Sequence, residues 1–227
     1  MIARDSDGVL ARVRFNRGNH FEVHLLPFEA QLAPAFGICV ADFDGDGHED
    51  IFLAQNFFAC QPETPRYDAG RGLWLRGNGH GEFTPVVGQE SGIKIYGEQR
   101  GCAVADFDGD GRVDLAVAQN GAEMKLYRNT EAKPGLRIRV QGPAENPHTI
   151  GACVRLGNEG HFGPMRELHS GSGYWSEDSA VSVMNGAPQS NQLWIRCPGG
   201  KTATVPLPAN AREITVNSSG QLATKQR

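Results

Sequence analysis

Short apolar runs of strand length alternate along the chain with turns rich in glycine, proline, asparagine and aspartate. Apolar residues do not recur at helical spacing over any long stretch. In the first part of the chain a strand is predicted before each acidic turn, and further strands are predicted over residues 51–54, 73–75, 83–87, 115–118 and 124–127. The pattern therefore predicts an all-β fold.

An internal repeat organises residues 1–130. The segment GICVADFDGDGHEDIFLAQN at 37–56 returns as GCAVADFDGDGRVDLAVAQN at 101–120, 64 positions later. A second landmark at 14–21 is echoed at 75–83 and, in truncated form, at 126–129. Four strands in roughly sixty residues is the size of a β-propeller blade. We expect a partial propeller of a half blade, a whole blade and a half blade, with more blades upstream; a two-repeat sandwich complete in itself is the alternative.

The first copy of the repeat carries an insertion of roughly 13 residues within 57–72, before the strand that follows. Long loops of this kind often carry function, and this one contains aromatic and basic side chains, namely Phe57, Phe58, Arg66, Tyr67 and Arg71. Ligand binding and packing between blades are both open interpretations of the insertion.

Each repeat copy also carries four aspartates at positions 1, 3, 5 and 9 of a nine-residue loop, with glycine at position 6. These carboxylates repel one another unless a cation lies among them, and flexible, oxygen-rich coordination suits Ca²⁺ better than Mg²⁺. The predicted calcium ligands of the first loop are Asp42, Asp44, Asp46, Asp50 and the backbone carbonyl of His48. Those of the second loop are Asp106, Asp108, Asp110, Asp114 and the backbone carbonyl of Arg112.

The loops are not EF-hands, because position 12 is Leu53 in one and Val117 in the other, each within a strand-like run. Residues 9–130 closely resemble the FG-GAP/VCBS repeats of integrin-type propellers, whose blades carry such loops. Four carboxylates and a carbonyl nearly complete the coordination of an ion, which favours a structural role over a catalytic one. Without a bidentate glutamate the affinity is expected to be weak, about 10⁻⁴ to 10⁻³ M, as in extracellular modules.

Residues 131–135 form a short predicted linker, and residues 136–227 form a second β domain, a small sandwich or barrel. Its strands are predicted over 136–140, 152–156, 165–168, 181–184, 192–195, 202–205 and 213–216. Three segments, 149–155, 170–174 and 193–201, resemble the ASPIC/UnbV domain of the cartilage acidic protein-like family. The chain departs from that family at 181–186, where a His-Phe-Gly-Leu-Gly segment is usual, and at Cys197, where tryptophan is usual.

Charge and composition limit the cellular locations and the classes of binding partner that can be expected for this chain. The net charge is −4, and 19 of the 26 acidic residues precede residue 131, including the eight loop aspartates, so nothing suggests nucleic-acid binding. The five cysteines form no CxxC pair, and buried free thiols are the main expectation. No apolar run is long enough to span a membrane. The weak calcium affinity predicts an extracellular, periplasmic or cell-surface location, with a signal peptide upstream of the given sequence.

No catalytic residues are assigned, because the chain has neither a G-x-S-x-G elbow nor clustered histidines. His169 and the following segment to Asp178 combine aromatic and small polar residues, as recognition surfaces do, although a packed turn fits equally. The predicted function is a non-catalytic calcium-binding scaffold that mediates adhesion to a protein or glycan ligand. The alternative is a calcium-dependent biosynthetic or hydrolytic enzyme with a cleft between propeller and C-terminal domain.

Overall fold

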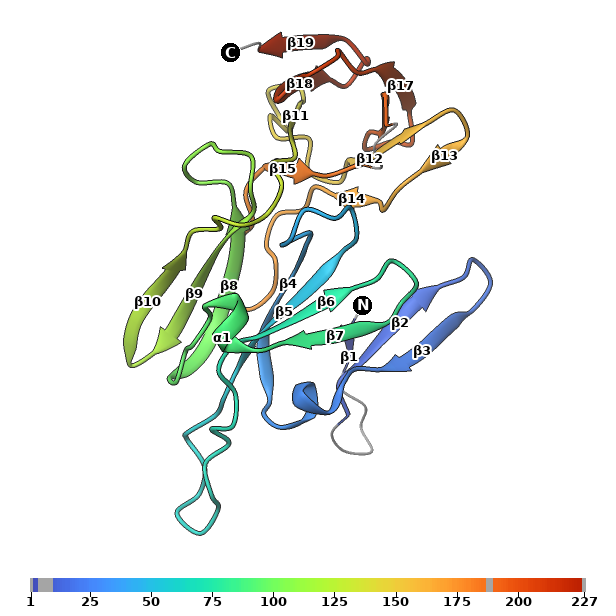
Figure 1. The fold of residues 1–227 in the computed structure, drawn as a ribbon. Coiled ribbons are helices and arrows are strands. Elements are labelled where there is room, and N and C mark those ends of the chain that lie inside the picture. The colour runs from blue at the N-terminus through green and yellow to red at the C-terminus, as the bar shows by residue number, and fades with distance from the viewer. Residues whose placement is uncertain (1, 4–9, 187–189, 226–227) are drawn as a thin grey trace.

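The computed structural model describes residues 2–3, 10–186 and 190–225 of the 227-residue chain. The all-β prediction is confirmed, because the described residues form mainly antiparallel sheets with little helix (Figure 1). The first part of the chain contains three sheets. Their strands are β1 (Ile2–Ala3), β2 (Arg12–Asn16) and β3 (Phe21–Leu25); β4 (Ala35–Ala41), β5 (Asp50–Gln55), β6 (Leu73–Gly77) and β7 (Phe83–Val86); and β8 (Glu98–Ala105), β9 (Asp114–Asn120) and β10 (Ala122–Tyr127).

The middle sheet is a four-stranded antiparallel meander in the order β4-β5-β6-β7, as expected of one propeller blade. The flanking sheets each have three strands, ordered β1-β2-β3 and β10-β9-β8. Strands β2 and β3 occupy the repeat positions of β6 and β7, and β8 to β10 occupy those of β4 to β6. The sequence repeat therefore corresponds to a repeated arrangement of antiparallel hairpins in the fold.

Strand β5 is buried along its whole length, which explains its unbroken apolar run. Phe52 and Ala54 share a core with residues of β8 and β9, whereas Ile51 and Leu53 pack with Val13 of β2. Alternate residues of one strand therefore contact the two neighbouring sheets. This face-to-face stacking of blades builds the core of the first part of the chain.

The C-terminal part is a β-sandwich of two sheets. The core between them comes from both, with Ile138, Ile214, Val154 and Leu193 all buried. One sheet has the order β15-β11-β18-β19, and the other has β13-β12-β16-β17 with β14 also beside β12. The strands are β11 (Leu136–Gln141), β12 (Cys153–Asn158), β13 (His161–Phe162), β14 (Arg166–Glu167), β15 (Val181–Met184), β16 (Gln192–Arg196), β17 (Thr202–Pro206), β18 (Glu213–Asn217) and β19 (Leu222–Lys225).

All seven strands predicted for this part are present, together with two strands that the sequence pattern does not predict, β13 and β19. Helical structure in the described residues is limited to two single turns, a 3₁₀ turn η1 (Phe28–Gln31) and helix α1 (Gly88–Ser91). Within the same residues, no helix has the length and apolar character needed to cross a membrane.

The insertion at 57–72 projects from the blades at the end away from the C-terminal sandwich (Figure 1). A β-bridge between Phe57 and Tyr67 closes its base. The guanidinium carbon of Arg100 lies 4.0 Å from the ring centroid of Phe36 and 5.6 Å from that of Phe57, so a cation–π contact ties the insertion to β4 and β8. Packing between blades therefore accounts for the base of the insertion.

The sandwich contacts the end of the blades that carries the two aspartate loops. Arg166 of β14 binds Glu49 at 2.5 Å and donates to the Val40 carbonyl at 2.9 Å. Asp178 accepts a hydrogen bond from the backbone N–H of Val104, and Val183 of β15 joins the core between the blades. The two parts are thus joined by buried apolar contact as well as by ion pairs.

Candidate metal centres

Both aspartate loops adopt the same turn, built on their first aspartate. Asp42 accepts hydrogen bonds from the backbone N–H groups of Gly45, Asp46 and Gly47 at 2.7, 3.1 and 2.9 Å. Asp106 accepts from Gly109, Asp110 and Gly111 at 2.8, 3.0 and 2.8 Å. The turn needs glycine at its sixth position, since φ is +91° at Gly47 and +85° at Gly111.

The ninth residue of each loop joins the loop to the next two strands. Asp50 accepts from the N–H of Phe43 at 3.0 Å and from that of Gly77 at 2.7 Å. Asp114 accepts in the same way from Phe107 at 3.1 Å and Asn129 at 2.8 Å. These two carboxylates are buried and hold three chain segments together in each blade.

Three of the four predicted carboxylates converge in each loop. One oxygen each from Asp42, Asp44 and Asp50 lie within 4.8 Å of one another, and Asp106, Asp108 and Asp114 form the equivalent group. The fifth-position aspartates are not in these groups: Asp46 accepts from the N–H of His48, and Asp110 from that of Arg112.

The side chains of the two predicted carbonyl ligands contact the protein elsewhere. The Arg112 side chain donates to the Ala132 carbonyl at 2.7 Å and pairs with Asp110 at 2.8 Å. The His48 ring lies against Gly79. The roles of Asp46, Asp110 and the carbonyls of His48 and Arg112 as ligands stay predictions.

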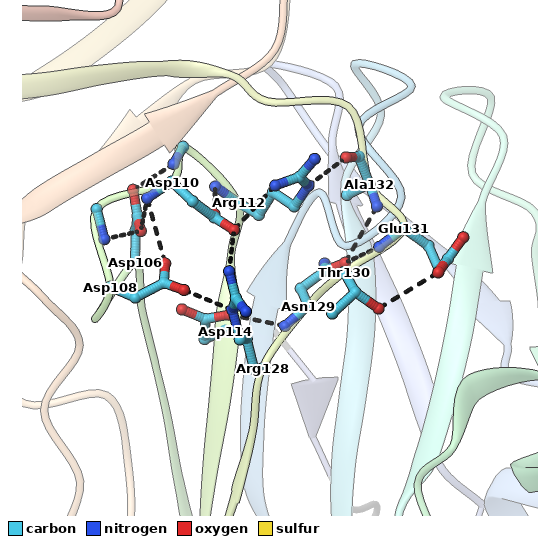
Figure 2. Close-up of polar contacts among 12 residues, drawn as sticks. Asp106, Asp108, Asp110, Arg112, Asp114, Arg128, Asn129, Thr130, Glu131 and Ala132 are labelled. Atoms are coloured by element: carbon cyan, nitrogen blue, oxygen red, sulfur yellow. Dashed lines mark hydrogen bonds and ion pairs between the residues drawn. The ribbon is translucent and has the colours of Figure 1, made fainter.

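Three arginines that the sequence pattern does not predict as site residues pair with aspartates of the two loops. Arg76 binds Asp44 at 2.8 Å, and Arg128, at the same position of the repeat, binds Asp108 at 2.5 Å. Arg137 of β11 pairs with Asp106, which connects the second loop to the sandwich. Figure 2 shows Arg112 and Arg128 converging on Asp110 beside the aspartate group. Arg76 and Arg128 occupy equivalent positions of the sequence repeat, so the repeat indicates that they have equivalent roles. Nothing in the local sequence indicates that Arg137 pairs with Asp106.

One oxygen atom in the first loop indicates that the donor set fits a cation. The Oδ1 atom of Asp44 is buried and has no hydrogen-bond partner, although its other oxygen binds Arg76. A buried carboxylate oxygen without a partner is costly unless it coordinates a metal. Three carboxylates with only oxygen donors suit a hard cation such as Ca²⁺, whose flexible coordination tolerates ligands from a loop.

Burial shifts the pKa values of two aspartates in the first loop. Burial raises the pKa of Asp42 to about 6 and that of Asp50 to about 7. The hydrogen bonds that both carboxylates accept from backbone N–H groups lower these pKa values only in part. Burial also raises the pKa of Asp114 in the second loop. A metal that binds the ionised carboxylates must therefore displace protons at mildly acidic pH.

Cation binding to the first loop is expected to be strongly pH-dependent. As pH falls from 7.5 to 5.5 it passes through the pKa values of Asp42 and Asp50, about 6 and about 7, so protons compete with a cation for both of these predicted ligands. We expect the calcium affinity of this loop to fall at least about tenfold over that range. Without metal the sign reverses: protonation stabilises the fold, and that contribution is complete below pH 3.8 and lost as pH rises through 6 to 7.

The second loop provides the comparison for this pH experiment. Calorimetric calcium titrations of the Asp108→Ala variant report the first loop, and titrations of Asp44→Ala report the second. The affinity of the second loop is expected to change less, because among its predicted ligands a raised pKa is found at Asp114 alone. Equal affinities at pH 7.5 and 5.5 in Asp108→Ala would contradict the role of Asp42 and Asp50 as ligands.

The comparisons with known proteins agree with this architecture. A family model described as "FG-GAP-like repeat" matches residues 42–117, which run from the first aspartate loop through the second. The chain is also 25% identical over 178 residues to cartilage acidic protein 1 of Xenopus tropicalis. That match covers 76% of this chain but 27% of the relative, so the chain spans about a quarter of the length of that protein. FG-GAP repeats are β-propeller blades, as the meander β4 to β7 is here.

Proposed function

We propose that this chain is part of an extracellular, calcium-stabilised propeller scaffold that binds a protein or glycan ligand without catalysing a reaction. The organisation proposed is blades over residues 1–130, a linker at 131–135 and an ASPIC/UnbV-like domain at 136–227. The proposed calcium ligands include the two converging groups of three aspartates. The match to cartilage acidic protein 1 supports the extracellular location and the ASPIC/UnbV assignment.

The calcium role is supported most directly by the buried, partnerless Oδ1 atom of Asp44 within a group of three carboxylates. In each loop such an ion would join the turn to the following strand, because Asp50 and Asp114 are the first residues of β5 and β9. The ion would therefore stiffen the end of the blades on which the sandwich rests. The chemistry that it supplies is neutralisation of clustered carboxylates, which is a structural contribution.

The binding role is supported by an exposed aromatic pair at 174–175. Trp175 is 92% exposed and has a left-handed backbone with φ of +49°, an unfavourable combination for a bulky residue. The loop is held in place, since the backbone N–H of Ser172 donates to the Ser176 carbonyl at 2.7 Å and Gly173 forms a β-bridge with Gly37. A rigid loop that displays tryptophan beside Tyr174 is a suitable contact surface for a sugar face or a protein partner.

The test is binding to a panel of purified extracellular polysaccharides and matrix proteins in millimolar calcium. We expect Trp175→Ala to weaken the strongest interaction at least about tenfold, since buried tryptophans dominate interface energies. The matched control is Phe28→Ala on η1, an aromatic residue that is 72% exposed. Unchanged binding by Trp175→Ala, or no binding to any member of the panel, would overturn the proposed surface.

A second candidate function is an enzyme, favoured by a cavity of about 880 Å³ where the sandwich meets the blades. Its lining includes His148, His169 and Asp178, and the Nε2 atom of His169 lies 3.7 Å from an Asp178 oxygen. Asp106 of the second loop also lines this cavity. Turnover of chromogenic ester, glycoside or phosphoester substrates that is lost on chelation would favour this alternative over the scaffold.

A further inference from the structure

Two cysteines from neighbouring blades face each other in the core. Cys39 lies on β4 and Cys102 on β8, and their Sγ atoms are 3.1 Å apart. They are only 1% and 2% exposed and belong to the same apolar cluster. The separation of the two sulfur atoms is much shorter than that of ordinary packed side chains, which touch at about 4 Å.

The backbones of β4 and β8 also approach closely enough for a covalent link. A Cβ atom placed on Gly37 would lie 2.7 Å from the Arg100 carbonyl oxygen and 3.0 Å from the Cys102 nitrogen. Since a disulfide bond is about 2.05 Å long, the two sulfur atoms need to approach each other by only about 1 Å.

We propose that Cys39 and Cys102 form a disulfide bond that joins adjacent blades of this protein. The oxidant is a small-molecule disulfide such as oxidised glutathione. One cysteine thiolate attacks it to give a mixed disulfide and releases one glutathione thiol. The thiolate of the other cysteine then attacks the sulfur of the first cysteine, which forms the Cys39–Cys102 bond and releases the second glutathione thiol. Two cysteine thiols lose two hydrogens in total, and one glutathione disulfide gains them. The proposal is independent of the ligand-binding role, because it depends only on these two residues.

The bond is expected to form while the chain folds. Its thiols are inaccessible once the blades have packed, and the neighbouring Cys102 thiol together with burial raises the pKa of Cys39 far above its ordinary value. The other cysteines have different neighbours. Cys60 contacts the Phe57 carbonyl, Cys153 the Arg196 guanidinium and Cys197 the Ser218 carbonyl.

The experiment is refolding of the full chain with oxidised and reduced glutathione, followed by alkylation in denaturant and peptide mass mapping without reduction. We expect a peptide pair linked through Cys39 and Cys102, two hydrogens lighter than the separate peptides. Three of the five cysteines should remain free, five less the two that are linked. Alkylation of all five cysteines, or a link from either residue to a different cysteine, would overturn the proposal.

Stability provides a second readout. The bond closes a loop of about 60 residues in the unfolded chain, so the melting temperature of the oxidised protein should exceed that of the reduced protein by on the order of 10 °C. This difference should vanish in Cys102→Ala and persist in the control Cys60→Ala. An equal difference in Cys102→Ala and the parent protein would also overturn the proposal, because it would assign the effect to another thiol.

Discussion

Replacing Asp50 with alanine is expected to lower the free energy of unfolding by about 2–4 kcal/mol even in the presence of chelator. The Asp50 carboxylate is fully buried and accepts hydrogen bonds from the N–H groups of Phe43 and Gly77. Alanine leaves both donors without a partner at the point where β4, β5 and β6 meet. Urea denaturation monitored by circular dichroism in chelator measures the loss.

Asp44→Ala is the matched control in the same loop. Asp44 pairs with the partly exposed Arg76, so its removal should cost less than about 1 kcal/mol in chelator. Both variants should lose the calcium response of the first loop, because both residues belong to its carboxylate group. If the two substitutions lowered stability equally in chelator, the structural role assigned to Asp50 would be wrong.

Calcium is expected to raise the melting temperature in a graded manner. With dissociation constants near 10⁻⁴ to 10⁻³ M, each site adds on the order of 1 kcal/mol at millimolar calcium and about 2.7 kcal/mol at a hundredfold excess. For a chain of this size, two sites then correspond to a rise of roughly 4–8 °C at a few millimolar calcium. Thermal denaturation in chelator and in increasing CaCl₂ measures it.

Single variants divide this calcium effect between the loops. Asp44→Ala and Asp108→Ala should each remove about half of the rise, and the double variant should remove all of it, if the sites are independent. Asp68→Ala, at an exposed acid on the insertion, should leave the response intact. A flat response, or an equal response to MgCl₂, would show that these loops are not calcium sites.

The sequence predicted the strands well where burial imposes a pattern. Strand β5 reads as an unbroken apolar run because both of its faces are covered, and strands such as β18 alternate because one face meets the sandwich core. Strand β19 was missed, since its segment Leu-Ala-Thr-Lys is too short and mixed to show a period. It pairs with its immediate predecessor β18 as an antiparallel hairpin.

Only those features of the candidate site that lie within a single loop could be predicted from the sequence. The spacing of the aspartates identified both loops, but it did not show that Asp46 and Asp110 bond to backbone N–H groups beside the converging carboxylates. Arg137 lies 31 residues beyond Asp106 and reaches it only because the sandwich docks on the blades. Long-range ion pairs of this kind leave no signal in residue spacing.

The parallel pairing of β11 with β18 sets the order in which the two parts of the chain become foldable during synthesis. The blade strands β4 to β7 pair with their immediate successors, so each hairpin has its partner soon after it emerges from the ribosome. Strand β11 pairs with β18 in a register that joins Arg137 to Glu213, 76 residues later. Pairing between strands that are distant in the sequence is slow to form. We therefore expect the blades to fold first and the sandwich to fold against their already folded surface.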